Sequence, residues 1–389
     1  MTTANTGALA QVRVLDLSDD RAIYAGKLLG DLGAEVARLE PPGGDPLRER
    51  APFHAAFDAE RGASLWHAFF ASSRRFVTVE DEAAGICRLT AAADIVLDCG
   101  RLAAAGLSGE ELIAANPQLV VVDVSSFGPD GPWADYLAPG LVAEALGGVA
   151  ATSGDPDTPP LKLYGDQYAF VAGTYAAIGA LAALRHARAS GEGQVVRLSV
   201  HEALSSVLEH VLMWAWYHEQ LPFAEGPVLP RRGSLHWSNA YVVMQAIGGS
   251  IMITPTPDFQ KQLAWLIEED VGLDLLDEKY AQPENLPLLI ARTMEVLREW
   301  VGGKEVEPFF HEAQARHHPY GWVMTIPEVA GNPQLEARDW WTDYQAGGPA
   351  TKGPGAPYHF SATPWSLSDG GDARAVPASD VVDAVGWGD

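Results

Sequence analysis

The segment Tyr164-Gly165-Asp166 stands directly before a stretch with helical character that begins at Tyr168. An aspartate in this position is first of all a helix cap, because its carboxylate accepts hydrogen bonds from the free N–H groups of the first turn. The same position suits a catalytic carboxylate, since the helix dipole favours an anion and the adjacent glycine allows a ligand to approach closely. Spacing alone favours the cap and leaves the nucleophile as the alternative.

The histidines and cysteines show no metal-binding or triad pattern. The pair His317-His318 precedes Pro319-Tyr320-Gly321 and is more typical of a surface turn than of a catalytic group. No HExxH or GxSxG motif occurs. Cys87 and Cys99 are the only cysteines and lack CxxC spacing, so we expect no metal centre, no disulfide framework and a cytoplasmic location.

A set of glycines near the N-terminus invites a dinucleotide-binding interpretation. Gly26, Gly30 and Gly33 follow one apolar run, and Glu40 ends the next one, where an acidic side chain could hold a ribose. These glycines lie within and after the expected helix, whereas the turn before it, residues 18–22, has two carboxylates and no glycine. That turn is a poor pyrophosphate cradle. We therefore interpret the glycines as allowing close packing between helix and sheet.

The elements that must position these residues alternate between strand and helix. Apolar runs rich in β-branched residues predict strands over residues 12–18, 35–40, 76–79, 94–98 and 119–125. Helical spacing predicts helices over residues 22–32, 82–92 and 108–115. This alternation predicts an α/β fold with a parallel sheet, and the continuous apolar strands indicate that helices cover both faces.

The chain beyond a Gly- and Pro-rich stretch at 127–139 has a different pattern. We expect helices over 168–186 and 200–217 with a short strand over 195–198 between them, then a β-hairpin over 240–254 and helices over 258–276 and 288–300. The uncharged stretch 167–184 is at the lower edge of membrane-spanning length, and we interpret it as a buried helix. A large domain over 1–224, with a return over 326–389, and a smaller α+β domain over 225–325 are expected.

The charge of the chain limits the classes of partner. There are 51 acidic and 26 basic residues, giving a formal net charge of −25, which disfavours binding to nucleic acid or to an anionic membrane. An anionic small ligand is compatible with this charge, because screening over about 10 Å hides distant carboxylates and a few local arginines suffice. The first residues lack a basic region followed by an apolar run, so we expect no signal peptide.

Several segments, in a fixed order along the chain, form a pattern that none of them forms alone. They are 14–18 (VLDLS), 28–36 (LLGDLGAEV), 40–48 (EPPGGDPLR), 125–133 (SSFGPDGPW), Gly165-Asp166 with the Ala/Gly-rich helix after it, 190–199 (SGEGQVVRLS) and 332–338 (NPQLEAR). This ordered set resembles the family III CoA-transferases, the group that contains formyl-CoA and carnitine CoA-transferases and the α-methylacyl-CoA racemases. The resemblance covers nearly the whole chain.

The resemblance implies a Rossmann-like large domain, a small domain and an interlocked dimer, for which we expect two identical subunits. It places the family's catalytic aspartate at Asp166, so that one residue can be both cap and nucleophile. The implied reaction moves CoA from an acyl-CoA thioester to a free carboxylic acid through an aspartyl-CoA intermediate. Coenzyme A enters as part of a substrate, and neither a metal nor a permanently bound cofactor is expected.

The resemblance also suggests which residues contact CoA. Positions where members commonly carry basic residues for the CoA phosphates hold Ala104 and Leu137 here. The residues expected at CoA, including arginines that could replace those basic groups, are Arg21, Ala22, Arg48, Arg75, Asp98, Cys99, Gly100 and Arg101. The nearest candidate for the family's glycine-rich loop is 231–234, and the aromatic segments 319–322 and 357–365 are similar to those of members that act on larger acids.

Two other functions are open at this point. An acyl-CoA racemase would pair the aspartate with a histidine in the segment after the Gly-Pro turn, but the corresponding place falls near Pro139, which favours transfer. The altered CoA positions would also suit a non-catalytic CoA-binding subunit of a heteromeric transferase.

Overall fold

The protein is described by a computed structural model that covers residues 6–41, 43–54, 64–221, 224, 226–231, 242–254, 259–344, 350–368 and 373–388. The chain divides into two compact units. Unit 1 comprises residues 1–151, 162–213 and 337–389, and unit 2 comprises residues 152–161 and 214–336. The boundaries expected from the sequence were 224/225 and 325/326.

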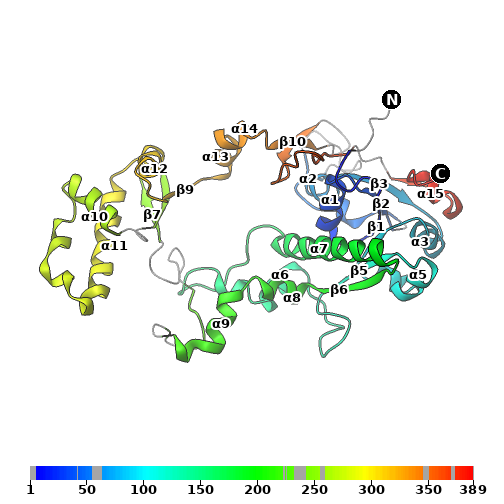
Figure 1. The fold of residues 1–389 in the computed structure, drawn as a ribbon, viewed down its shortest axis with the longest axis horizontal. Coiled ribbons are helices and arrows are strands. Elements are labelled where there is room, and N and C mark those ends of the chain that lie inside the picture. The colour runs from blue at the N-terminus through cyan, green and yellow to red at the C-terminus, as the bar shows by residue number, and fades with distance from the viewer. Residues whose placement is uncertain are drawn as a thin grey trace. The chain divides into compact units, whose positions relative to one another are not determined.

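A parallel sheet forms the centre of unit 1 (Figure 1). Its strands, in spatial order, are β12 (Arg374–Ala375), β3 (Arg74–Thr78), β2 (Glu35–Leu39), β1 (Arg13–Leu17), β4 (Ile95–Asp98), β5 (Val120–Ser125) and β6 (Gln194–Ser199). All these neighbours pair in parallel. The predicted α/β class and parallel sheet are confirmed. The strand order reverses between β1 and β4, and in such sheets ligands bind outside the carboxyl ends of the strands at that point.

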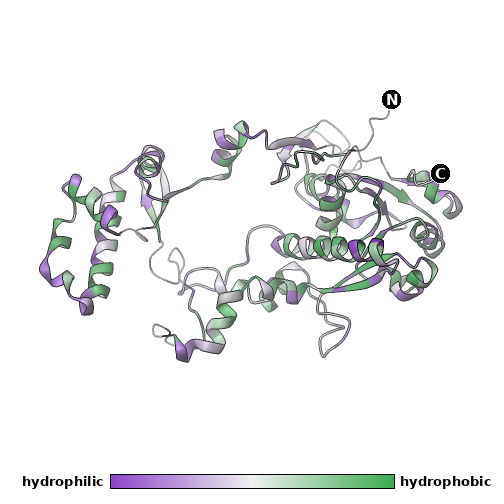
Figure 2. Ribbon diagram, viewed as in Figure 1, coloured by the Kyte–Doolittle hydropathy of each residue, from purple (hydrophilic) through white to green (hydrophobic). Residues whose placement is uncertain are grey.

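Helices cover both faces of this sheet, and its strands are apolar on both sides (Figure 2). One face packs against α1 (Ile23–Asp31) and α7 (Gln167–Ser190). The other packs against α3 (Glu82–Thr90), α5 (Gly109–Ala115) and α15 (Val381–Ala384). The remaining elements of this unit include α2 (Leu65–Phe70), α4 (Arg101–Ala104), α6 (Gly140–Leu146), α8 (Val200–Ser206) and the hairpin β10 (Trp341–Tyr344)–β11 (Thr351–Pro354).

The glycines of the first helix serve packing, as predicted. A Cβ at Gly30 would lie 2.7 Å from the carbonyl oxygen of Ser73, and one at Gly26 would overlap the Arg74 guanidinium. On the opposing helix, a Cβ at Gly173 would lie 2.7 Å from the Cβ of Tyr24. These close approaches let α1 pack tightly against both the sheet and α7.

The helix α7 is the one described helix that is long and apolar enough to cross a membrane, by length and composition alone. Half of its most apolar 18-residue window is buried inside the structure, through an alanine-rich face that covers β5 and β6. The sequence-based interpretation as a packed helix therefore holds for that face. Tyr175 and Ile178 lie on its exposed side, at 39% and 58% of full exposure.

Two predicted helices are wrong in extent. The helix expected over 200–217 is interrupted between α8 and α9 (Glu209–Tyr217). The helix expected over 258–276 ends as α10 (Phe259–Glu268), because Asp270 and Gly272 adopt positive φ angles of 59° and 63°, which a right-handed helix excludes. The short helices α2 and α6 were not predicted at all.

Unit 2 is built on a small antiparallel sheet of β7 (Val242–Ala246), β8 (Gly249–Ile253) and β9 (Gly321–Val323). The first two strands confirm the predicted hairpin. The helices α10, α11 (Leu286–Gly302) and α12 (Val306–Ala315) pack with this sheet around Trp265, Trp300 and Phe309. The short helices α13 (Ile326–Ala330) and α14 (Pro333–Ala337) follow.

Candidate active site

Asp166 occupies the N-cap position of α7 but its side chain does not cap the helix. Its Oδ2 instead accepts a hydrogen bond from the indole Nε1 of Trp66 at 2.6 Å, and its Oδ1 lies 3.5 Å from Nη2 of Arg50. Asp81, which does cap α3, shows the alternative: its carboxylate accepts the backbone N–H of Ala84 at 3.0 Å. The cap favoured by spacing is thus wrong for the side chain of Asp166, which is directed to other groups and is 21% exposed.

Arg50 links Asp166 to a second carboxylate. Its Nη1 donates to Oδ2 of Asp20 at 2.9 Å, and its guanidinium lies over the Trp66 ring, 4.4 Å from the centroid. The hydroxyl of Tyr168 donates to the same Asp20 oxygen. Burial opposes the charge of Arg50, but hydrogen bonding with Tyr168 and the charges of Asp166 and Asp20 outweigh it and raise the pKa of the guanidinium.

These groups come from separate segments of unit 1, which is why the sequence did not single them out. Asp20 lies in the turn after β1, Arg50 follows the short 3-10 helix Pro46–Glu49, Trp66 lies in α2, and Tyr168 lies in the first turn of α7. Burial, followed by the charge of Asp20, raises the pKa of Tyr168. The one signal in the sequence was the pair of carboxylates in the turn after β1, which require cations somewhere in the fold.

Two glycines shape the surroundings of Asp166. Gly165 has a φ of 77°, and no heavy atom lies within 4 Å of the position where its Cβ would be. The approach to Asp166 from this side is therefore open, as the sequence suggested. At the start of α6, a Cβ on Gly140 would overlap the ring of Tyr168, so only glycine fits there.

The expected CoA-binding residues divide into two groups. Six of them lie at the carboxyl ends of the adjacent strands β1 and β4, where the strand order reverses: Arg21 and Ala22 after β1, and Asp98, Cys99, Gly100 and Arg101 from the last residue of β4 to the first of α4. Arg21 joins these turns, because its Nη2 donates to the carbonyl of Cys99 at 2.8 Å while Asp19 holds its Nε at 3.0 Å. Asp98 caps α4 through the N–H groups of Gly100 and Arg101, and burial raises its pKa despite these bonds.

The other expected residues make internal contacts elsewhere in the unit. Arg48 donates to Glu40 at 2.8 Å and lies over the Phe76 ring, and Arg75 donates to the carbonyl of Val385 at 2.5 Å. Arg101 also pairs with Glu82, at 2.9 Å. The contacts of all these residues with CoA stay predictions. In the loop candidate 231–234, only Arg231 lies within the described residues.

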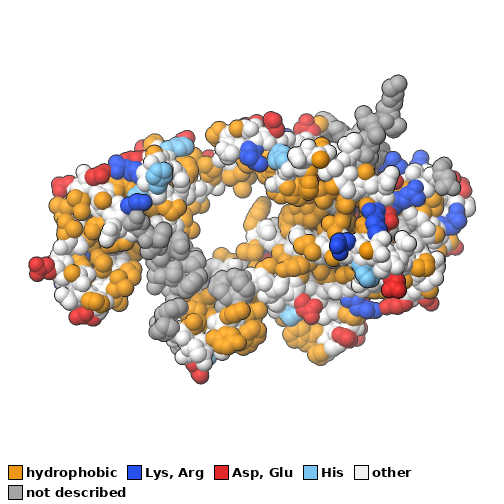
Figure 3. All heavy atoms as spheres, viewed as in Figure 1, with side chains coloured by type: hydrophobic (Ala, Val, Ile, Leu, Met, Phe, Trp, Pro, Cys, Tyr) orange, Lys and Arg blue, Asp and Glu red, His pale blue; other side chains and the backbone are white. Residues whose placement is uncertain are grey.

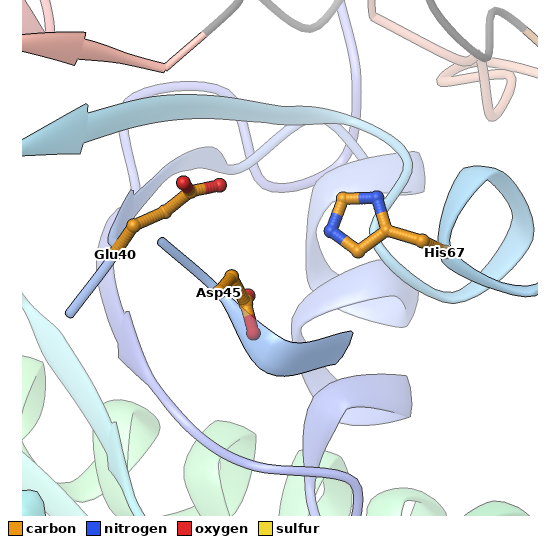
Figure 4. Close-up of side chains that lie close together, drawn as sticks. All are labelled: Glu40, Asp45 and His67. Atoms are coloured by element: carbon orange, nitrogen blue, oxygen red, sulfur yellow. The ribbon is translucent and has the colours of Figure 1, made fainter. Parts of the chain in front are cut away.

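A second cluster of ionisable groups lies buried near this site. Ligand atoms of Glu40, Asp45 and His67 lie within 4.8 Å of one another, and the His67 ring points from α2 toward the two carboxylates (Figure 4). Each carboxylate already has a cation, because Glu40 accepts from Arg48 at 2.8 Å and Asp45 from Arg38 at 2.7 Å. The two carboxylates are therefore already paired with guanidinium groups. A divalent cation placed between them would be in contact with two positively charged arginines.

Burial and the neighbouring arginines keep His67 neutral. Burial, then the nearby charges of Arg48, Arg38 and Arg74, lowers the pKa of His67 to about 2. Its Nε2 is buried and has no hydrogen-bond partner among the described residues. The fully buried Asp16 on β1 binds Arg74 on β3 at 2.6 Å and Arg38 on β2 at 3.1 Å, so that one anion is shared by two guanidinium groups from the neighbouring strands.

Comparisons with known proteins show what the chain as a whole is similar to. The model of the family described as CoA-transferase family III matches residues 9–371. The chain is similar to succinyl-CoA–D-citramalate CoA-transferase of Chloroflexus aurantiacus, with 38% identity over 216 residues, and the match spans only about half of each protein, 52%. It is also similar to subunit BbsE of succinyl-CoA:(R)-benzylsuccinate CoA-transferase of Thauera aromatica, with 30% identity over 92% of this chain and 89% of that one. The crystal structure of a CAIB/BAIF family protein from Brucella suis has a similar fold, with a TM-score of 0.78, 26% identity and coverage of 93% of this chain and 95% of that one.

Proposed function

The chain belongs to CoA-transferase family III, and on that premise we propose that it transfers CoA between carboxylic acids with Asp166 as the covalent nucleophile. Its substrates as a class are acyl-CoA thioesters and free carboxylic acids. Relatives carry succinyl-CoA in their names, which makes succinyl-CoA the first donor to test.

The proposed reaction proceeds in two matched halves. Oδ1 of Asp166 attacks the donor's thioester carbonyl, the C–S bond breaks, and a mixed anhydride and CoA thiolate form. The thiolate attacks the Asp166 acyl carbon, breaking the anhydride and releasing the donor acid as a carboxylate. The acceptor carboxylate then attacks the aspartyl-CoA thioester, breaking its C–S bond and forming a second mixed anhydride and CoA thiolate. The thiolate attacks the acceptor's acyl carbon, which forms the new acyl-CoA and releases the Asp166 carboxylate. No net proton or electron transfer is needed, and in each step the nucleophile attacks an acyl group that is already activated as a thioester or an anhydride.

The observation that carries the proposal is the freedom of the Asp166 carboxylate from the helix it begins. Trp66 holds Oδ2 at 2.6 Å, which fixes the plane of the carboxylate and leaves Oδ1 as the attacking atom. Arg50 is the one cation that the structure places within 4 Å of it among the described side chains. A carboxylate that only capped the helix would instead face the N–H groups of α7.

The turns at the carboxyl ends of β1 and β4 support the placement of CoA. We propose that Arg21, Ala22, Asp98, Cys99, Gly100 and Arg101 line the CoA site, and that Arg48 and Arg75 contribute to it. Gly100 has a φ of 100° and open space where its Cβ would be, so its backbone is accessible to a ligand. No permanently bound cofactor is proposed.

The assembly we propose is an interlocked homodimer, working in the cytoplasm. Large apolar side chains are exposed on unit 1, and apolar groups are visible on its surface in Figure 3. The most exposed of them are Tyr136 (57%), Leu137 (89%), Leu141 (59%), Tyr164 (97%), Ile178 (58%) and Met213 (57%). Isolated soluble units rarely leave so many apolar side chains uncovered, so a partner surface accounts for them.

Trapping the covalent enzyme tests the mechanism directly. The protein is incubated with a panel of acyl-CoAs that includes succinyl-CoA, and its intact mass is measured with and without hydroxylamine. We expect an enzyme-bound CoA ester, and a hydroxamate on the peptide that contains Asp166. Asp166→Asn should abolish both, whereas the matched cap variant Asp81→Asn should keep both with little change in stability, because asparagine caps a helix about as well as aspartate. No adduct across the panel, or an adduct on another residue, would refute the assignment.

A further inference from the structure

Arg50 is held as a rigid, partly open cation beside the nucleophile. One side of its guanidinium is bound to Asp20 at 2.9 Å, its face lies on the Trp66 ring at 4.4 Å, and its side chain is 32% exposed. Its second terminal nitrogen, Nη2, lies 3.5 Å from Oδ1 of Asp166, which is longer than a good charged hydrogen bond. The guanidinium is therefore fixed by other groups and does not depend on Asp166 for its position.

The reaction changes the charge on only one side of this cation. In the free protein, Arg50 faces the carboxylates of Asp20 and Asp166. When Asp166 is converted to an anhydride or a thioester, its negative charge is lost, while Asp20 keeps its charge and its bond to Nη1. Arg50 then carries a positive charge whose Nη2 side has no anion, in a half-buried site where an unpaired charge is unfavourable.

The group that arrives or departs at that stage is itself a carboxylate. The donor acid leaves as an anion from the acylated Asp166, and the acceptor acid enters as an anion to attack it. Arginine presents parallel N–H donors that match the two oxygens of a carboxylate. A substrate carboxylate bound to Nη2 would replace Oδ1 of Asp166 as the anion at that nitrogen. It would lie next to the reacting acyl carbon.

We propose that Arg50 is the binding group for the free acid substrate, and that its Nη2 exchanges the Asp166 carboxylate for the reacting carboxylate of the acid in each half of the reaction. The inference rests on the proposed function and adds to it the recognition of the acid. Asp20 and Tyr168 act as positioning residues, since they hold Arg50 through the exchange. The site accepts carboxylates and gives no advantage to neutral nucleophiles.

The test separates charged from neutral nucleophiles. Incubation with succinyl-CoA converts the enzyme to its aspartyl-CoA form. Two rates are then measured: exchange of radiolabelled succinate into succinyl-CoA, and release of CoA by hydroxylamine. For Arg50→Gln we expect the KM for succinate to rise about 10- to 100-fold, the scale of a lost charged hydrogen bond, with the KM for succinyl-CoA and the hydroxylamine rate unchanged. Arg50→Lys keeps the charge without the fork and should be intermediate.

Arg13→Gln provides the matched control. Arg13 has a similar side-chain exposure, 36%, and lies at the amino end of β1, the opposite end of the strand from Asp20. It should leave both rates as in the unaltered protein. An unchanged KM for succinate in Arg50→Gln, or a hydroxylamine rate that falls together with exchange, would overturn the inference while the Asp166 adduct still forms. If the unaltered protein forms no adduct at Asp166, the proposed function fails, and this inference fails with it.

Discussion

Replacing His67 by phenylalanine should make the protein less sensitive to mild acid. His67 is 6% exposed, and its pKa in the folded protein is about 2, against an ordinary value of 6.5. Between pH 7 and pH 5 the unfolded chain therefore takes up a proton at this residue and the folded protein does not. Stability falls as the pH falls through the unfolded value, because the unfolded state binds more protons.

The size of this effect follows from the unfolded state alone. An imidazole with a pKa of about 6.5 is about one quarter protonated at pH 7 and almost fully protonated at pH 5. The linkage relation then gives a loss of about 2 kcal/mol over this interval, provided only that the folded pKa lies well below 5. The carboxylates and the other histidines are common to both proteins, so the difference between wild type and variant isolates His67.

Urea denaturation followed by circular dichroism, with hydrogen exchange of the β1 and β2 amides to report on unit 1, measures this difference at both pH values. We expect the unfolding free energy of wild type to fall by about 2 kcal/mol more than that of His67→Phe. His67→Gln serves as a second variant if the phenyl ring packs poorly. If the unfolding free energies of wild type and both variants changed equally with pH, the conclusion that His67 is buried and neutral would be refuted. A chelator that lowered the wild-type midpoint would show that the cluster holds a metal.

Three further changes test the site and its support. Trp66→Phe removes the 2.6 Å hydrogen bond to Asp166 but keeps an aromatic face under Arg50, so kcat should fall about 10- to 100-fold with an unchanged circular dichroism spectrum. Asp16→Asn leaves two buried guanidiniums without their shared anion and should lower the unfolding free energy by about 3–5 kcal/mol in urea titrations. Gly140→Ala forces a methyl group against Tyr168 and should cost about 1–3 kcal/mol, whereas Gly302→Ala, with no neighbour within 4 Å, should be neutral or stabilising in the same assay.

The sheet could be predicted from the sequence because its strands are buried on both faces. Continuous apolar runs such as 119–125 have no other favourable arrangement, and the alternation with helices fixes parallel pairing. The errors lie where local conformation departs from the periodic pattern. The residues after 268 keep a helical spacing of apolar groups, but Asp270 and Gly272 adopt left-handed backbone angles that spacing does not reveal. The strand β12, two residues long, carries too little pattern to be recognised.

The residues of the candidate site could be expected only in part, for a related reason. Asp166 was singled out by the family resemblance, whereas the adjacent glycine and helix start alone favoured a cap. Arg50 and Trp66 lie 116 and 100 positions away from it, and nothing in their immediate neighbours marks them. Their approach to Asp166 is set by how α2 and the loop before it fold against α7, which is tertiary information. Local reasoning also favoured a cap at Asp166, since it could not see the indole N–H that binds the carboxylate instead.

The turn after β1 shows why its carboxylates are compatible with anionic substrates. Asp19 holds Arg21, and Asp20 holds Arg50, so that each acid fixes one guanidinium at the carboxyl edge of the sheet. Both arginines have raised pKa values, since their acidic partners outweigh burial, and both therefore stay charged. Distant charge is screened over about 10 Å, so the net charge of −25 has little influence at that edge compared with these two cations. The acidic turn, which is unsuited to cradle a phosphate through its own backbone, thereby positions the groups that can bind anions.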